Sequence, residues 1–222
     1  MIWKIKVFFL RLVEYIVRWP YRLLQFISWL FFIHRPHGKY VGVRWMIGMI
    51  LKSIDLLPIQ VIFETILDIM KWKTRPMTLD EKRIAESVFG KRINYSLVGL
   101  DSNSWPVKKG RAQAYVGFHT INFFNSIPDH VLIHELTHIW QYRKHGSFYI
   151  TESLYAQRWG GGYNYGGMDA LEKNKDQGLM AFNFEQQAEI VEDAYRSKFS
   201  SDYIAYLDEI RNHEEASTKD VG

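Results

Sequence analysis

The sequence predicts an α+β fold in which a mainly helical, amphipathic N-terminal module precedes a domain of helices and a small sheet. With 222 residues, the chain is long enough for a compact domain and an additional module. Charge divides the same way: residues 1–77 carry 12 Lys/Arg and 4 Asp/Glu, whereas the remainder carries 16 and 20. Apolar residues recur at helical spacing in the first part, and helix-start and helix-end signals surround short β-rich segments in the second.

Composition excludes several kinds of site. The chain has no cysteine, so it has no disulfide framework, no cysteine-based zinc site and no thiol nucleophile. Basic residues interleave with apolar ones and do not form a solvated patch, so we expect no nucleic-acid partner.

The first 33 residues resemble a signal peptide or a membrane span only superficially. Arg11 and Glu14 interrupt the apolar stretch that a signal peptide needs. Arg18 and Arg22 leave only about half of the roughly 20 apolar residues that a span needs. Pro20 predicts a break into two helices. The basic residues recur at intervals of seven, seven and four, which places them on one helical face: Lys4, Arg11, Arg18 and Arg22.

A second apolar stretch, residues 45–72, is interrupted by Lys52, Asp55, Glu64 and Asp68 and is divided by Pro58. Basic amphipathic helices rich in Trp and Phe are typical of membrane surfaces. We therefore expect residues 1–76 to form a membrane-associated module, peripheral or embedded, that contacts lipid through residues 1–70. Two alternatives remain open: the helices pack as an ordinary core, or residues 23–33 and 45–70 insert as hairpins that form a pore in an oligomer.

Residues 73–83 mark the expected boundary between the two parts. Thr78 and Glu81 have the spacing of a capping box, and the helix that follows ends at Gly90. The second domain is predicted to span residues 77–210, with a flexible tail at 211–222.

The segment "HVLIHELTHIWQ", residues 130–141, contains the principal candidate site. A capping pattern at Ser126 and a glycine at Gly146 predict a helix over about 127–145. His134 and His138 then lie one turn apart on one face, where both imidazoles can reach one zinc ion. Glu135 lies on the flank, where its carboxylate can act as the general base on water.

A catalytic zinc site needs a third protein ligand. His145 fits better as a cation near the helix end, and Asp169 lacks supporting neighbours.

The segment 182–195 begins with a capping pair, Asn183 and Gln186, and places three carboxylates on one face of a helix: Glu185, Glu189 and Glu192. We expect Glu185 to be the third ligand and Glu189 to accept the outward N–H of a ligating histidine. The reverse roles, or a merely solvated stripe, remain alternatives.

With these motifs, "HELTHIWQY" and "FEQQAEIVEDAY", the chain resembles the HELTH-type gluzincin-like metallopeptidase domain of bacteria, described as Vgr-related and found near contractile-injection and toxin loci. The segments "LDEKRIAESVFGKRINYSLVGL" and "GFHTINFF" extend the likeness over about residues 77–196. The resemblance implies a bacterial zincin-like domain, an active-site helix with a small sheet, that binds Zn²⁺ through His134, His138 and Glu185, with Glu135 as base.

Two further segments are candidates for the walls of a substrate cleft. Residues 111–124 read as an edge strand to which an extended peptide can add, and His119 on it either faces the cleft or is half-buried in the core. The glycine-rich loop 158–167 carries Tyr163 and Tyr165, either of which can donate to an oxyanion. The loop is equally consistent with a plain connection.

The expected function is zinc-dependent hydrolysis of peptide bonds in a peptide or protein substrate. Two alternatives are a non-catalytic structural or binding component of a bacterial secretion or toxin system, and a toxin whose N-terminal module acts on membranes.

Overall fold

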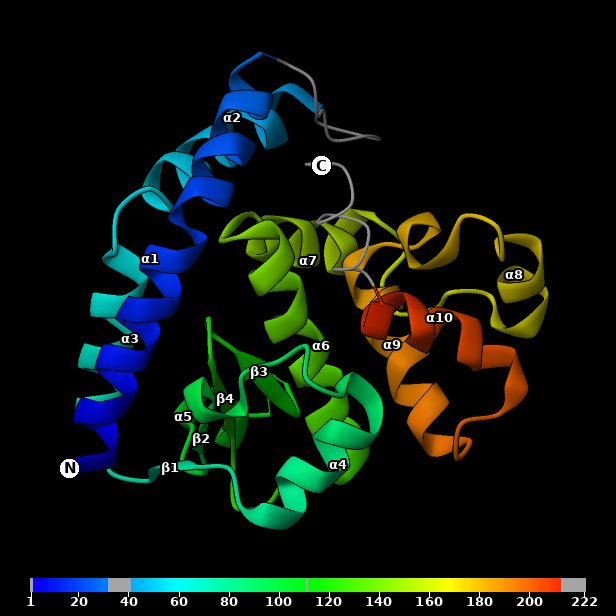
Figure 1. Ribbon diagram of the computed structural model, residues 1–222. Coiled ribbons are helices and arrows are strands. Elements are labelled where there is room, and N and C mark those ends of the chain that lie inside the picture. The colour runs from blue at the N-terminus through cyan, green and yellow to red at the C-terminus, as the bar shows by residue number, and fades with distance from the viewer. Residues whose placement is uncertain (1, 32–40, 111, 213–222) are drawn as a thin grey trace.

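The fold is α+β, as predicted, and most of its elements are helices. A computed structural model describes residues 2–31, 41–110 and 112–212. Three parts lie side by side: a layer of N-terminal helices, a small mixed sheet, and a group of C-terminal helices around a central helix (Figure 1).

The N-terminal layer consists of α1 (Ile2–Leu30), α2 (Val41–Ile54) and α3 (Ile59–Met70). The predicted break at Pro20 is wrong, because α1 continues through it as one helix of 29 residues. Pro58 does divide the second stretch, since it occupies the N-cap of α3, and α2 and α3 meet at 78°. In the described parts of the chain, no single helix has the length and apolarity of a membrane span; only the bent α2–α3 pair meets both criteria together.

The sheet has the strand order β1-β2-β4-β3. The strands are β1 (Thr74–Pro76), β2 (Gly99–Asp101), β3 (Ala114–Val116) and β4 (Thr120–Phe123). β2 and β4 are parallel, whereas the other two pairs are antiparallel. The single strand expected over 111–124 is therefore wrong: the segment folds back as a β3–β4 hairpin, and β3 forms one edge of the sheet.

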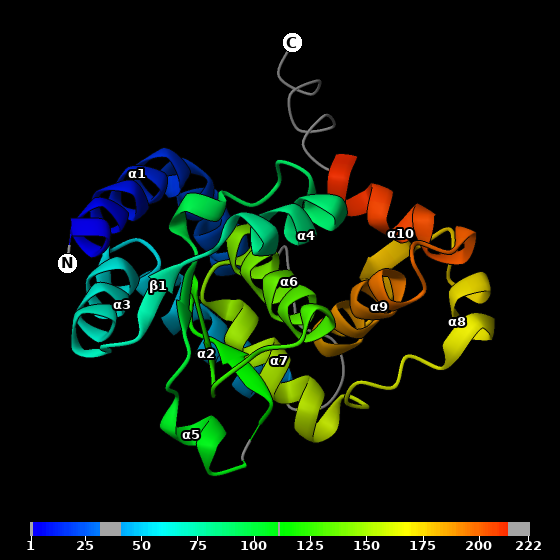
Figure 2. The same ribbon diagram turned by 90° about the horizontal axis from the view of Figure 1, so that it is seen from below.

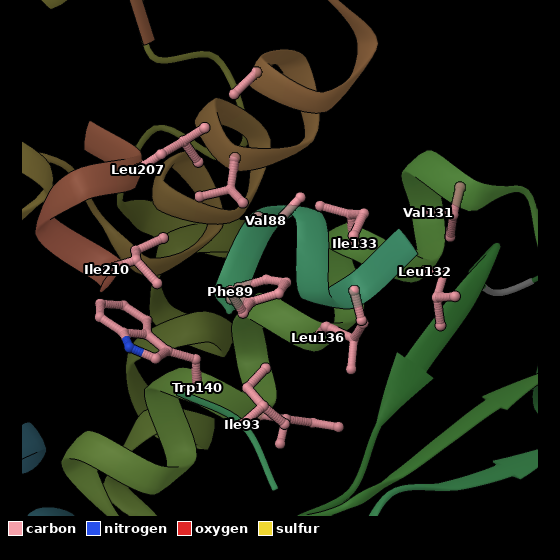
Figure 3. Close-up of a cluster of buried hydrophobic side chains, with 14 of the residues drawn as sticks. Val88, Phe89, Ile93, Val131, Leu132, Ile133, Leu136, Trp140, Leu207 and Ile210 are labelled. Carbon is pink, nitrogen blue, oxygen red and sulfur yellow. The ribbon is translucent and has the colours of Figure 1, made fainter. Parts of the chain in front are cut away.

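The central helix α6 (Asp129–His145) carries the HExxH motif and lies between the sheet and the C-terminal helices (Figure 2). It begins two residues later than predicted, because Pro128 has an extended backbone and occupies the N-cap in place of a side-chain cap at Ser126. Gly146 ends it, as expected. Its core face packs on α4 (Leu79–Phe89), which has the predicted capping box at Thr78 and ends at Gly90. In Figure 3, Phe89 of α4 lies between Leu136 of α6 and Ile210.

The remaining elements are the turn Tyr95–Leu97, α5 (Trp105–Lys108), α7 (Phe148–Trp159), α8 (Gly167–Lys173), the turn Gly178–Ala181, α9 (Phe184–Arg196) and α10 (Ser201–Asn212). They complete the sheet side and the C-terminal group of helices, and of these α7 and α9 pack directly on α6. The predicted capping box of Asn183 and Gln186 starts α9. The helix α10 extends into the expected tail, whose residues 213–222 lie outside the described part of the chain.

Polar contacts attach the N-terminal layer to the rest of the molecule. In the described chain, the main hydrophobic cluster begins at Met77 and takes no residue from α1, α2 or α3. Arg11 of α1 donates to the Leu97 carbonyl at 2.9 and 3.1 Å and contacts Asp68 of α3 at 2.7 Å. Arg22 donates to the Tyr142 carbonyl at 2.8 Å. The hydrophobic cluster around α6 is therefore separate from the N-terminal layer, which contacts the rest of the molecule through buried charges and through apolar contacts such as that of Trp29 with Phe148.

Candidate metal centre

The two motif histidines and Glu185 converge from α6 and α9, which pack closely together. His134 and His138 lie one turn apart on α6, and their ring centroids are 5.1 Å apart. Glu185 stands in the first turn of α9, 47 residues after His138 in the sequence. Its Oε2 atom lies 3.6 Å from Nε2 of His134 and 3.5 Å from Nε2 of His138. All three side chains are buried.

These separations match a tetrahedral ion site. With metal–ligand bonds of about 2.0–2.1 Å, tetrahedral directions put neighbouring ligand atoms about 3.3–3.4 Å apart. Separations of 3.5 and 3.6 Å are also too long for good hydrogen bonds. Accordingly, the buried Oε2 of Glu185 has no hydrogen-bond partner. A buried carboxylate oxygen without a donor is costly, and a cation at the centre of the three atoms would satisfy it.

The outward nitrogen of each imidazole is already engaged. Nδ1 of His134 lies 3.1 Å from Oε2 of Glu192, and Nδ1 of His138 lies 2.7 Å from Oε1 of Gln141. Gln141 in turn donates to the Phe184 carbonyl at 2.9 Å. In the neutral form of each ring, an acceptor at Nδ1 holds the proton on that nitrogen and leaves Nε2 with the free lone pair that a metal ion requires. Both rings thus present Nε2 to the shared centre.

Glu192, not Glu189, is the close partner of His134. Oε2 of Glu189 lies 3.9 Å from Nδ1, beyond hydrogen-bonding distance. The reason is helical phase: a residue seven positions after Glu185 returns to within about 20° of the same direction, whereas one four positions after it is rotated by about 40°. The imidazole of His134 consequently lies between Glu185 and Glu192, two turns apart on α9, and Glu189 is half-buried beside it.

The electrostatics of the centre favour a cation. Burial raises the pKa of Glu135 above its ordinary value. Burial also disfavours the charged form of His134, but Glu185 and Glu192 outweigh it and raise the pKa of that imidazole to about 10. For Glu185, burial is outweighed by the two imidazoles, which lower the pKa of the carboxyl. Several carboxylates around two imidazoles give a site that is short of positive charge.

A cleft of about 690 Å³ opens on this centre, within the usual range of ligand sites. It is lined by the edge strand β3 and by α6, α7 and α9. Glu135 faces it next to the candidate ligands, and Tyr163 stands at its rim with its ring centroid 5.9 Å from that of His134. Burial, with the nearby carboxylates, raises the pKa of Tyr163 to about 12, so its hydroxyl remains a donor at neutral pH.

Two of the sequence candidates lie elsewhere. His119 is in the turn between β3 and β4, where Nδ1 lies 2.9 Å from Glu64 and the ring packs on Tyr142; it lines a separate small cavity beneath α1. Tyr165 points toward α10, because its hydroxyl donates to Asp193 at 2.7 Å and lies 3.0 Å from that of Tyr203. The expected role of Tyr165 in the cleft is therefore wrong, and His119 follows the alternative in which it is buried in the core.

The structure also adds residues that the sequence analysis did not single out. Gln157 of α7 donates to Oε1 of Glu185 at 3.1 Å and fixes the carboxylate with Oε2 toward the imidazoles. Tyr149 of α7 lines the cleft and donates to the Gly117 carbonyl. Gln141 had a usable signal, since it lies three residues after His138 on the same helix. Gln157 and Tyr149 had none, because α7 reaches the site only through tertiary packing.

Comparison with protein-family models, with curated proteins and with solved structures finds no match to this chain, so the resemblance to HELTH-type gluzincin-like domains remains a prediction based on the sequence motifs.

Proposed function

We propose that the chain is a zinc-dependent metallopeptidase with a zincin-like catalytic domain. The observation that carries the proposal is the position of the unsatisfied Oε2 of Glu185, which lies 3.6 Å from Nε2 of His134 and 3.5 Å from Nε2 of His138. Two histidines and a glutamate, with a fourth position left open, form a donor set typical of catalytic zinc. Structural zinc sites are closed by four protein ligands, whereas this centre faces a cleft.

Each residue of the site would have a distinct role in hydrolysis. His134, His138 and Glu185 would hold the ion, which supplies Lewis acidity to a substrate carbonyl and to water. Glu135, at the cleft wall, would accept a proton from the attacking water and deliver it to the leaving amine nitrogen. Tyr163 would donate a hydrogen bond to the carbonyl oxygen as negative charge develops there.

An extended peptide is the substrate shape that the cleft favours. β3 pairs with β4 along one side only, and three of its residues, Ala114, Tyr115 and Val116, line the cleft. A peptide strand can add to such an edge by backbone hydrogen bonds, which are independent of side-chain identity. The edge would then hold the backbone across the face of α6 that carries the motif.

Three variants of the full chain test the proposal. Glu185→Ala should lower zinc content from one ion per chain to near zero, measured by metal analysis after dialysis. His138→Ala should do the same. Glu135→Gln should retain zinc and lose at least about 100-fold in hydrolysis of a quenched peptide library, because a positioned base contributes about 10²–10⁴-fold.

The outcomes separate the mechanism from its alternatives. Wild-type hydrolysis by Glu135→Gln would exclude the proposed base. Zinc bound stoichiometrically by a wild-type chain that cleaves no peptide of the library would leave a metal-binding structural protein. Full zinc content in Glu185→Ala would refute the ligand set.

A further inference from the structure

The N-terminal layer has its polarity reversed relative to an ordinary surface layer. In the described chain, 34 large apolar side chains are exposed, and 25 of them lie between Ile2 and Trp72. The layer's buried positions are, conversely, rich in charge. Its fully or largely buried polar residues are Arg11, Arg22, Arg44, Lys52, Asp55, Gln60, Glu64 and Asp68. A water-soluble surface helix shows the opposite arrangement, with its apolar stripe toward the core.

The exposed apolar residues form continuous faces. On α1 they follow a helical stripe that runs the length of the helix, about 43 Å at 1.5 Å per residue: Ile2, Ile5, Phe9, Val13, Ile16, Leu24 and Ile27, with Phe31 just after the helix. On α3 the same spacing gives Ile59, Ile62, Phe63, Ile66, Ile69 and Met70, and α2 adds Val43, Met46, Ile47 and Ile50. α1 packs on both α2 and α3, so the stripes belong to one layer, here called the outer face (Figure 1).

The buried charges explain why the outer face cannot simply turn inward. Glu64 of α3 accepts from the backbone N–H groups of His119 and Thr120 at 2.6 and 2.7 Å. Asp55 accepts from the Ser147 backbone at 2.9 Å, and Arg44 of α2 pairs with Glu152. These contacts specify which side of the layer meets the catalytic domain, because breaking a buried ion pair leaves an uncompensated charge. The apolar side is therefore held outward.

Charge selects the partner that covers the outer face. The acidic residues of the layer, Glu14, Asp55, Glu64 and Asp68, are all buried or half-buried, whereas the basic residues Lys6 and Lys73 are exposed. Trp72, next to Lys73, is 98% exposed. An apolar face bordered by positive charge and Trp is complementary to an anionic phospholipid surface. A second copy of the same face would instead bring like charges together at its rim.

We propose that the outer face of α1, α2 and α3 lies in the interfacial layer of an anionic phospholipid bilayer, with the catalytic domain held on the opposite, polar side of the layer. The module is seated on one leaflet and does not cross it, because α2, α3 and the connection between them are bound to the catalytic domain through Arg44, Glu64 and Asp55. Burial of the apolar side chains among lipid chains supplies the affinity, and Lys6 and Lys73 add attraction to lipid phosphate. The inference is independent of the metal.

Vesicle flotation of the metal-free full chain tests it, with vesicles of phosphatidylcholine containing about 30% phosphatidylglycerol. Ile62→Glu/Ile66→Glu places two carboxylates in the outer face. Leu79→Glu/Ile204→Glu is the matched control, with the same charge change at exposed apolar positions of the catalytic domain. Wild type and control should float with the vesicles, and the outer-face variant should lose at least about ten-fold in vesicle affinity, since each carboxylate must be taken out of water.

Circular dichroism and light scattering accompany each sample. Unchanged helical content in the outer-face variant, with lost flotation, supports the proposal. It is overturned if the wild type stays unbound, whether as a monomer or as a dimer covering the outer face, or if the outer-face variant floats as well as the control. High salt should weaken wild-type flotation without abolishing it, because only the phosphate attraction is screened. Complete loss at high salt would contradict insertion of the apolar side chains.

Discussion

The contact between Glu192 and His134 predicts a difference between two carboxylates on one helix. Glu192→Ala removes the acceptor that lies 3.1 Å from Nδ1 of His134. Glu189→Ala makes the same chemical change one turn earlier, where the nearest oxygen is 3.9 Å away. Alanine is favourable in helix interiors, so neither substitution should disrupt α9. Comparing the two variants separates the effect of losing the hydrogen bond to His134 from the effect of losing any negative charge near the centre.

The magnitude follows from burial and distance. Removing a carboxylate that orients a ligating histidine typically costs about 10–100-fold in metal affinity, or about 1.4–2.7 kcal/mol. The side chain of Glu192 is only 10% exposed, so solvent weakly screens its contact with His134. The side chain of Glu189 is 29% exposed and lacks a hydrogen bond to the ring. We expect Glu189→Ala to change zinc affinity by less than about three-fold, as for other partly solvated ion pairs.

Competition against a chromophoric zinc chelator measures both dissociation constants at fixed pH and ionic strength. Far-UV circular dichroism of the metal-free variants controls for folding. Equal losses of zinc affinity in the two variants would mean that only the lost negative charge matters, and would refute the orienting role of Glu192. A larger loss in Glu189→Ala would restore the role that the sequence analysis gave to that residue.

Three further results are expected. Glu64→Gln should speed hydrogen exchange of the amides in 114–120 by about ten-fold or more, measured by mass spectrometry, because charge-assisted bonds to this turn contribute about 1.5–3 kcal/mol; unchanged exchange would contradict the clamp. Phe89→Ala should lower the free energy of unfolding by about 3–5 kcal/mol in urea titrations, because its ring is fully buried; a loss below about 1 kcal/mol would refute its place in the core. Burial opposes the ionised form of Glu81, but Arg75 and the Thr78 N–H lower its pKa in the folded chain. Its stabilising contribution should therefore be complete above about pH 4.5, the ordinary value, and disappear as pH falls through the lower folded value. Thermal unfolding of Glu81→Gln should show a weaker acid dependence than wild type, and identical curves would contradict this account.

Local signals in the sequence were sufficient for several elements. The capping boxes at Thr78 and Asn183 and the glycine ends at Gly90 and Gly146 occur where predicted. Such signals are reliable because the interacting groups lie within four residues of each other, so the surrounding fold has little influence on them. The one-turn spacing of His134 and His138 is equally local.

At other positions, tertiary packing produced a structure that differs from the prediction made from local sequence patterns. Pro20 was expected to divide the first helix, but α1 continues, supported along its length by α2, α3 and the Tyr95–Leu97 turn. The hairpin of β3 and β4 was predicted as one strand, because its turn at 117–119 contains no conspicuous turn pair. Glu64 stabilises that turn from a helix more than 50 residues away, and no local pattern reports such a contact.

By itself, the sequence determined the α+β class, the face of α6 that carries both imidazoles, and the amphipathic character of the N-terminal helices, because these depend on spacing within one element. Only the tertiary structure decided which carboxylate meets which nitrogen, and which side of each N-terminal helix points away from the protein. Those outcomes depend on the rotation and crossing of helices distant in the chain. Glu189 and Glu192 differ by about 60° in direction around α9, less than the roughly 100° between successive residues, so a rotation of one helix by that amount is enough to exchange them.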